Sequence, residues 1–201
     1  MKSERLALFD FDGTITTKDT LFLFCRFLVG DVRFIVGLIL LLPVLVGQRV
    51  KLISAQRAKE ILLTYFIRKM KATEFDLKCQ HFALQVLPRF IRSQASKTIL
   101  NFKQEGVRVI IVSASPQNWI KPWAETVNAE VIATQLQVDE NQITGRLKGK
   151  NCNGEEKVNR IKAEIDLNQF KSISAYGDTS GDLPMLALAQ QKFFKPFRDN
   201  D

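Results

Sequence analysis

Two aspartates directly follow the first apolar segment of the chain. Residues 6–9 read Leu-Ala-Leu-Phe, a run typical of a buried strand, and Asp10 and Asp12 come at its end with Phe11 between them. Burying one unpaired carboxylate is costly and burying two costs more, so we expect both side chains to line a polar crevice rather than the core. A carboxylate can also attack phosphorus and form an aspartyl-phosphate. This strand end is therefore a candidate for metal binding and for nucleophilic chemistry.

A second acidic motif, GDTSGD at residues 177–182, follows another predicted buried strand, 172–176, and contributes Asp178 and Asp182. Gathered at one place, these aspartates and the first pair would repel one another unless a cation lay between them. No cluster of His or Cys accompanies them, and His81 is the only histidine of the chain. Ligand sets made of oxygen alone favour hard cations, and Mg²⁺ is the common one at phosphate sites. We therefore predict Mg²⁺ as the cofactor.

An anionic substrate at this site would need positive charge and hydrogen-bond donors. At about 4 Å and an effective dielectric constant near 20, two like charges repel by roughly 4 kcal/mol, so a phosphate dianion facing a carboxylate costs about 8 kcal/mol. A divalent cation and a lysine are the expected remedy, and Lys157 lies near the predicted start of a helix. Ser113 adds a hydroxyl at the end of another apolar run, where backbone N–H groups can also bind a phosphoryl oxygen.

The segments that carry these residues alternate between strands and helices. Further buried strands are predicted at 107–115, 129–134 and 172–176. Residues 136–147 indicate a hairpin that turns at 139–142. This alternation favours a parallel α/β sheet, in which ligands bind beyond the carboxyl ends of the strands. Residues 18–87 are mostly helical in pattern and separate the first strand from the second, so we interpret them as an insertion.

Four motifs in this chain order resemble those of the haloacid dehalogenase-like superfamily: DFDGT, the serine of VSAS, Lys157 and GDTSGD. The aspartate two residues after the first resembles the phosphatase branch, and the helical insertion resembles the C1 cap of the phosphoserine-phosphatase-like subclass, subfamily IB. The resemblance covers nearly the whole chain. It implies an α/β fold with a Rossmann-like parallel sheet core, residues 1–17 and 88–201, and an inserted helical cap domain, residues 18–87.

The resemblance also implies which residues carry the reaction and hold the metal. Asp10 would be the nucleophile and a Mg²⁺ ligand. Asp12 would be the general acid and base, and its backbone carbonyl would bind the same ion. Asp178 would be a further Mg²⁺ ligand.

A second group of residues would hold the phosphoryl group. The resemblance implies that Ser113 and Ala114 bind it and that Lys157 bridges it to the nucleophile. Asp182 would hold either the water molecules of the metal or Lys157. Phosphoserine phosphatases often have Ser-Gly-Gly where residues 113–115 of this chain read Ser-Ala-Ser, so the departure leaves the substrate open.

A long apolar segment, residues 21–50, lies within the predicted cap. Its most apolar part, FIVGLILLLPVLVG at 34–47, has 14 residues, which is shorter than the roughly 20 that a spanning helix needs, and Pro43 is expected to bend or break it. One interpretation is contact with an anionic membrane surface, which the net charge of +8 also favours. The other is that the segment packs inside the cap or in a dimer interface.

The rest of the sequence limits the classes of partner and the location that we expect. No basic run interleaved with aromatic residues stands out, so nucleic acid is not expected as a partner. Asp19, Arg57 and Lys59 lie on the cap side, where relatives contact substrate, but we expect all three to be solvated. Because charged residues interrupt any signal-peptide pattern near the N-terminus, we expect an unexported, cytoplasmic protein, with a peripheral position at the inner face of the membrane as the alternative. The sequence leaves the oligomeric state open.

These observations lead us to expect a Mg²⁺-dependent phosphomonoesterase. Its substrate would be a small phosphometabolite of the phosphoserine type or a lipid phosphate of the phosphatidylglycerophosphate type. The alternative is a peripheral membrane-binding protein with weak or lost phosphatase activity. A glycosyltransferase with a DxD motif is disfavoured, because its chemistry would require neither GDTSGD nor Lys157.

Overall fold

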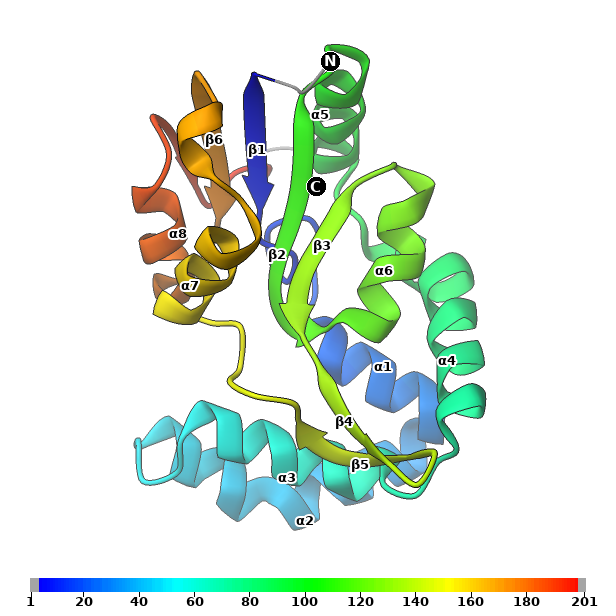
Figure 1. The fold of residues 1–201 in the computed structure, drawn as a ribbon. Coiled ribbons are helices and arrows are strands. Elements are labelled where there is room, and N and C mark those ends of the chain that lie inside the picture. The colour runs from blue at the N-terminus through cyan, green and yellow to red at the C-terminus, as the bar shows by residue number, and fades with distance from the viewer. Residues whose placement is uncertain (1–3, 199–201) are drawn as a thin grey trace.

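A five-stranded parallel sheet forms the centre of the computed structural model, which describes residues 4–198 (Figure 1). The strand order is β3-β2-β1-β6-β7, and every neighbouring pair is parallel. The strands are β1 (Arg5–Phe9), β2 (Arg108–Pro116), β3 (Glu130–Thr134), β6 (Ser172–Gly177) and β7 (Gln191–Phe194). The predicted parallel α/β core is therefore confirmed. The outermost residues of the predicted core, 1–3 and 199–201, lie outside the described residues.

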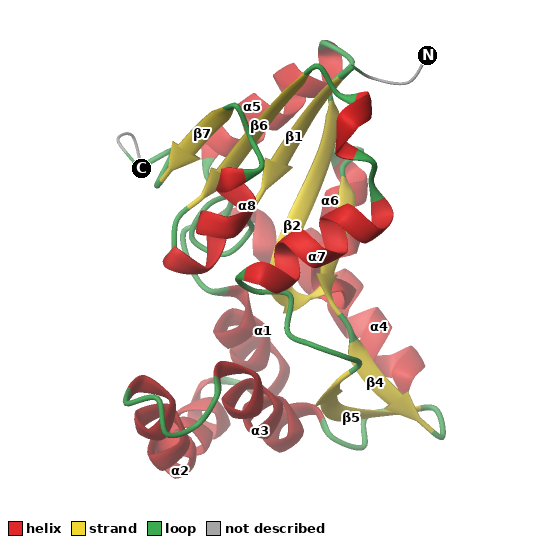
Figure 2. Cartoon of the chain, turned by 60° about the vertical axis from the view of Figure 1, so that its left-hand side comes forward, coloured by secondary structure: helices red, strands yellow, loops and turns green. Residues whose placement is uncertain are grey.

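Residues 6–9 of the central strand β1 are all apolar and buried, because both faces of the sheet are covered there. Side chains alternate along a strand, so Ala7 and Phe9 enter one core cluster while Leu6 and Leu8 enter the other. The first cluster includes residues of α5 (Ser93–Gln104) and α6 (Gln117–Thr126), and the second includes residues of α7 (Glu155–Glu164) and α8 (Leu183–Ala187). Figure 2 shows α7 and α8 in front of the sheet and α5 behind it.

The parallel register brings the two acidic motifs to one edge of the sheet. Phe9 of β1 is paired with Tyr176 of β6, and Asp10 donates its backbone N–H to the carbonyl of Tyr176 at 2.8 Å. Asp10 and Asp178 therefore follow neighbouring strands at the same level. The inserted helices α1 to α3 lie beyond this edge of the sheet (Figure 1), the edge at which ligands bind in parallel α/β sheets.

The insertion contributes four α-helices, α1 (Thr20–Val29), α2 (Asp31–Arg49), α3 (Ala55–Ile67) and α4 (Ala72–His81), and a π-helical turn at Phe82–Val86. Figure 2 shows α1, α2 and α3 together below the sheet, beyond its carboxyl edge. The hairpin of β4 (Leu136–Asp139) and β5 (Gln142–Leu147) forms where the sequence predicts it and packs on α3, while α4 packs on α6. The inserted helices therefore contact a hairpin that lies outside residues 18–87, the range predicted for the cap.

The sequence predicts that the apolar segment bends or breaks at Pro43, and the structure shows no break: Pro43 lies inside the continuous helix α2. This helix has 19 residues and contains the whole 14-residue apolar run, so by length and composition it is long and apolar enough to cross a membrane. A proline within a helix removes one backbone hydrogen bond and leaves the carbonyl four residues earlier without its donor. Pro43 is exposed, so this local cost falls on the outer side of the helix, where solvent can hydrate a free carbonyl.

Candidate active site

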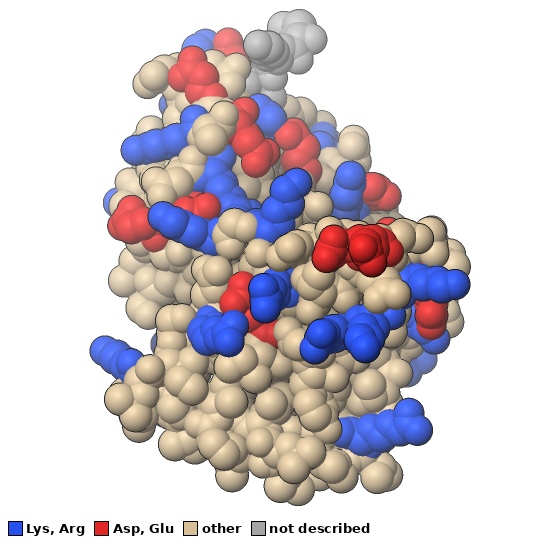
Figure 3. All heavy atoms as spheres, turned by 60° about the horizontal axis from the view of Figure 1, so that its bottom comes forward, with Lys and Arg blue, Asp and Glu red and all other residues tan. Residues whose placement is uncertain are grey.

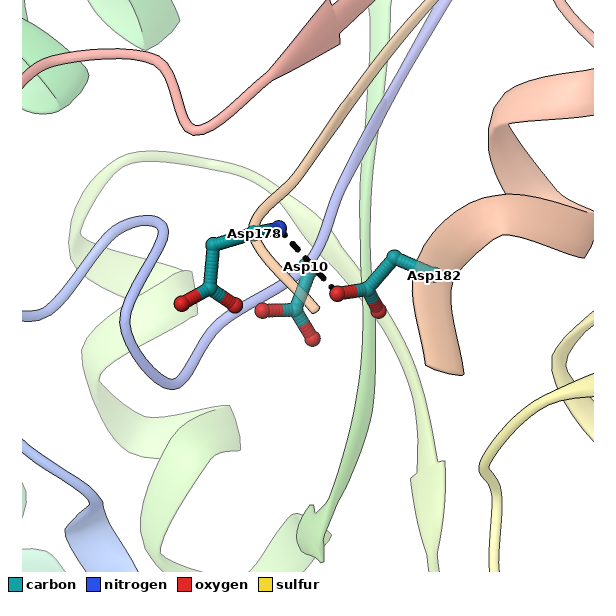
Figure 4. A group of neighbouring side chains, drawn as sticks. All are labelled: Asp10, Asp178 and Asp182. Atoms are coloured by element: carbon teal, nitrogen blue, oxygen red, sulfur yellow. Dashed lines mark hydrogen bonds between the residues drawn. The ribbon is translucent and has the colours of Figure 1, made fainter. Parts of the chain in front are cut away.

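Three carboxylates meet at the carboxyl edge of the sheet. Figure 4 shows Asp10 at the end of β1 between Asp178 and Asp182, which come from the segment after β6. One oxygen from each lies within 4.8 Å of the others. Asp10 and Asp182 are buried and Asp178 is half-buried, so the cluster is largely withdrawn from water. The parallel register places these carboxylates side by side although residues 10 and 178 are far apart in the chain.

Both carboxylate oxygens of Asp10 accept a hydrogen bond. Lys157 Nζ donates to Oδ1 at 2.6 Å, and Thr14 Oγ1 donates to Oδ2 at 3.0 Å. Burial raises the pKa of Asp10 to about 7, and the nearby carboxylates of Asp182 and Asp12 act in the same direction, while Lys157 opposes them. More positive charge beside Asp10 would favour its ionised form, which is the form that can act as a nucleophile.

Lys157 is the buried cation of the site. Its Nζ donates to Asp10 Oδ1, to Asp182 Oδ1 at 2.7 Å and to the carbonyl of Val112 at 2.8 Å, so all three of its protons have an acceptor. Burial by itself would lower the pKa of Lys157, but the attraction of Asp10 and Asp182 outweighs it and holds the pKa above its usual value. Lys157 therefore stays charged between two carboxylates.

Asp182 uses its carboxylate to hold the segment after β6 in place. Its Oδ2 accepts from the backbone N–H groups of Asp178 and Thr179, at 3.1 and 2.9 Å, and from the Thr179 hydroxyl at 2.9 Å. Burial acts to raise the pKa of Asp182, but Lys157 and the Thr179 donors outweigh it and keep the pKa below its usual value. Since its oxygens already have donors from the chain, Asp182 orients Asp178 and Lys157.

Asp178 carries the one carboxylate oxygen of this cluster that has no donor. Its Oδ1 is buried and without a hydrogen-bond partner among the described residues, while Arg198 donates to Oδ2 at 3.0 Å. Burial and the neighbouring Asp182 raise the pKa of Asp178. Gly13, with φ of 85°, passes so close to this carboxylate that a side chain there would collide with it. A buried, unsatisfied oxygen beside two other carboxylates fits a hard divalent cation such as Mg²⁺.

Asp12 lies beside this cluster and turns its carboxylate toward the start of α1. Its Oδ1 accepts from the backbone N–H and the hydroxyl of Thr20, at 2.7 and 2.6 Å. Thr20 is buried, and its hydroxyl in turn accepts from the indole N–H of Trp119 at 3.1 Å. Ser113 Oγ lies 3.4 Å from the other oxygen of Asp12. These bonds hold the Asp12 side chain in one orientation at the rim of the site.

Sequence reasoning missed two threonines that touch these aspartates. Thr14 stands inside the DFDGT motif, four residues after Asp10, and its hydroxyl is the donor to Asp10 Oδ2. Thr20 follows Asp19, whose carboxylate accepts from the Leu21 N–H at 2.9 Å and caps α1. An Asp-Thr pair before an apolar run is a helix-start signal that could have located Thr20 at the first turn.

Lys59 corrects the expectation that it is solvated. This residue of the inserted helix α3 donates to the carbonyl of Ala114 and to Oδ1 of Asn151, both at 2.8 Å. Burial lowers the pKa of Lys59, although Asp12 and Asp19 act in the opposite direction. The lysine thereby joins the inserted helix α3 to β2 at Ala114 and to Asn151. Arg57, by contrast, is exposed as expected.

The structure thus brings six of the predicted residues to one place: Asp10, Asp12, Ser113, Lys157, Asp178 and Asp182. Ala114, the seventh, bonds to Lys59 through its carbonyl. The chemical result is a carboxylate at a strand end, a second carboxylate two residues on, a buried lysine and an oxygen cluster suited to a divalent cation. Such a set can support nucleophilic attack by a carboxylate on an electrophile that carries negative charge.

Comparisons with known proteins concern the family and the fold of this chain. The family model described as haloacid dehalogenase-like hydrolase matches residues 7–187. Protein CicA of Caulobacter vibrioides is 33% identical over 195 residues, which cover 96% of this chain and 86% of that protein. A Bordetella pertussis Tohama I protein described as having unknown function has a solved structure with a TM-score of 0.80 and 22% identity, covering 94% of this chain and 89% of that one.

Two solved phosphoserine phosphatase structures have the same fold. A substrate-bound complex has a TM-score of 0.63 and 18% identity, and covers 96% of this chain and 87% of that chain. A phospho-aspartyl intermediate analogue has a TM-score of 0.62 and 20% identity, and covers 95% and 86%. At these identities the likeness establishes the fold.

Proposed function

Because this chain belongs to the haloacid dehalogenase-like hydrolase family, we propose that it is a Mg²⁺-dependent phosphomonoesterase that works through an aspartyl-phosphate on Asp10. The observation that carries the proposal is the buried Asp10 carboxylate. It accepts a hydrogen bond from Lys157 and lies beside the Asp178 oxygen that has no hydrogen-bond donor. Asp10, Asp178 and the backbone carbonyl of Asp12 would hold the ion. When bound, Mg²⁺ would supply positive charge that offsets the repulsion between the phosphate and these carboxylates.

The reaction divides into two displacements at phosphorus. In the first, an oxygen of Asp10 bonds to phosphorus and the bond to the leaving oxygen breaks, while Asp12 donates a proton to the departing alkoxide. In the second, Asp12 takes a proton from water, the water oxygen bonds to phosphorus, and the bond to Asp10 breaks. Phosphate leaves and both aspartates return to their starting states. Lys157 and Ser113 would hold the phosphoryl oxygens during both steps.

The substrate class remains between two candidates. A small phosphometabolite of the phosphoserine type is supported by the fold that this chain shares with phosphoserine phosphatases. A lipid phosphate of the phosphatidylglycerophosphate type is supported by the exposed apolar side of α2. Turnover rates on phosphoserine and on a micellar lipid phosphate, each with and without Mg²⁺, would decide between the two. The expected cytoplasmic localisation stays a prediction.

A second function deserves a test because α2 is so exposed: a peripheral membrane-binding protein with weak or lost phosphatase activity. Turnover of p-nitrophenyl phosphate that requires Mg²⁺ and stops when EDTA is added would support the enzyme. No turnover across divalent cations and phosphate esters, by protein whose circular dichroism is that of a folded α/β domain, would favour the second function.

Replacing Asp178 tests the metal assignment. We expect Asp178→Ala to raise the Mg²⁺ concentration for half-maximal activity by at least about tenfold, because a direct ligand is lost. Lys157→Ala should move this midpoint less, since it removes a charge and no ligand. The measurement is p-nitrophenyl phosphate turnover titrated with Mg²⁺, and Asp139→Ala, at an exposed position of the hairpin, is the matched control. An unchanged midpoint in Asp178→Ala would contradict the assignment.

Replacing Thr20 tests whether it positions Asp12. Thr20→Val removes the hydroxyl that donates to Asp12 Oδ1 and keeps the shape, so we expect kcat to fall by about tenfold with KM nearly unchanged. Thr20→Ser keeps the donor and should restore most of kcat, which a purely structural role of the methyl group would not do. Thr98→Val, on α5, controls for loss of a threonine hydroxyl elsewhere. Equal kcat in Thr20→Val and the wild type would remove Thr20 from this role.

A further inference from the structure

One side of α2 presents a row of large apolar side chains to solvent. These residues, which we call the α2 face, are between 48% and 76% exposed: Val32, Ile35, Val36, Ile39, Leu40, Leu42 and Val46. Most of them follow the three- and four-residue spacing that places side chains on one side of a helix. A surface helix of a soluble domain normally carries polar residues on that side. From Phe34 to Gly47 the chain has no charged residue at all.

The opposite side of α2 is already used in packing. Only Gly37, Leu41 and Gly47 are buried within this helix. Gly37 lies so close to the rings of Tyr65 and Phe66 that a side chain there would collide with α3, and Gly47 lies against Ile53. Helix α2 therefore packs against α3 and Ile53 along one side and is exposed to solvent along the other. Within the described residues, no segment of the chain covers the α2 face.

Basic residues stand near both ends of this apolar face. Figure 3 shows a broad uncharged surface with Lys and Arg side chains at its margins. Arg33, Arg49 and Lys51 stand near the two ends of α2, and all three are exposed. Residues 21–70 contain eight Lys and Arg against two Asp and Glu, so most of the net charge of +8 resides in this part of the chain. An apolar centre with a basic margin complements a bilayer that carries anionic head groups.

The sheet topology excludes a spanning position for α2. The helix is about 28 Å long, close to the thickness of a hydrocarbon core. However, β1 precedes it in the chain, and β2 and β6, which follow it, pair with β1 on either side. A single crossing by α2 would put β1 on one side of the membrane and its two partners on the other. Helix α1, with 10 residues, is too short to cross back. The helix can meet a bilayer only by lying along its surface.

Charge also distinguishes a bilayer from a second copy of the chain. In a two-fold dimer the same surface meets itself, so the basic margin around one α2 face would lie against the basic margin of the other. Like charges placed together oppose association, whereas anionic lipid attracts the same margin. We propose that the α2 face docks the protein on anionic bilayers, with α2 parallel to the membrane plane and its apolar side chains in the acyl boundary. This goes beyond the proposed phosphatase reaction and does not depend on it.

Vesicle flotation tests the proposal. The protein should float with vesicles of phosphatidylcholine and phosphatidylglycerol at low salt, less with phosphatidylcholine alone, and less as salt screens the basic margin. Ile39→Asp with Leu40→Asp should lower the partition coefficient on anionic vesicles by at least about tenfold, because two charges would enter the acyl boundary. Leu77→Asp with Leu100→Asp, two exposed leucines on α4 and α5, is the matched control and should float like the wild type.

A second measurement keeps the test independent of any loss of folding. Trp119 and Trp123 are both buried, so Leu40→Trp introduces an exposed indole, whose emission should shift to shorter wavelength when anionic vesicles are added. Asp10→Asn should float like the wild type, so failure of docking and failure of the proposed reaction are read separately. No flotation at low salt overturns the proposal. Flotation that Ile39→Asp with Leu40→Asp leaves unchanged also overturns it. A third contrary outcome is a dimer, detected by light scattering, that the same double substitution converts to a monomer.

Discussion

Asp10→Asn is expected to lower turnover of p-nitrophenyl phosphate by at least about 10⁴-fold, because an amide cannot attack phosphorus in place of a carboxylate. The substitution keeps the size of the side chain, and the Asn carbonyl oxygen can still accept from Lys157 or Thr14. The fold should therefore survive, which circular dichroism checks. Asp139→Asn, the same change at an exposed position, should keep full activity.

A trapping experiment locates the phosphoryl group directly. After rapid acid quenching with substrate, the wild type should carry one added phosphoryl group on the peptide that contains Asp10, and Asp10→Asn should carry none. An Asp10→Asn enzyme with wild-type turnover would overturn the mechanism. If the wild type is phosphorylated on a different residue, the protein is still a phosphatase, but the assignment of Asp10 as the nucleophile is wrong.

Lys157→Met is expected to lower the free energy of unfolding by about 3–5 kcal/mol, because it leaves Asp10 and Asp182 as buried carboxylates without their shared cation. The methionine is apolar and similar in length, so the loss reflects charge rather than a cavity. Urea unfolding at neutral pH in EDTA measures it, since EDTA removes divalent ions that could compensate. Lys162→Met, at an exposed position of the same helix α7, should change the free energy of unfolding little.

The partner of Lys157 provides a stricter test of the same idea. Lys157→Met combined with Asp182→Asn should be more stable than Lys157→Met alone, since one of the two uncompensated charges is gone. Turnover by both variants should stay at least about a hundredfold below the wild type, because the charge that faces the nucleophile and the phosphate is missing. If Lys157→Met unfolds at the urea concentration of the wild type, Lys157 is not the buried cation of the site.

The sequence by itself determined the core of the protein and most of its candidate site. An apolar run that ends in Asp10 and Asp12 predicts a buried strand with its polar residues at the rim, and β1 has that form. Alternation with helices makes the sheet parallel, and parallel strands bring their carboxyl ends to one edge, so Asp178 lies near Asp10. These inferences succeed because they depend on side-chain period, chain direction and residue chemistry, all of which are local properties.

Only the tertiary structure decided which side chains meet across the site. In the sequence, Lys59 is one basic residue of an amphipathic helix. It donates a hydrogen bond to the carbonyl of Ala114 because the fold brings α3 close to β2 at that residue. Thr20 reaches Asp12 because the turn after β1 folds the start of α1 back over the strand end. The composition of residues 21–50 indicated that this segment would favour an apolar environment. It did not indicate that α2 would continue through Pro43 or that one side of the helix would be exposed. Burial and partners depend on the packing of whole elements, which no local pattern records.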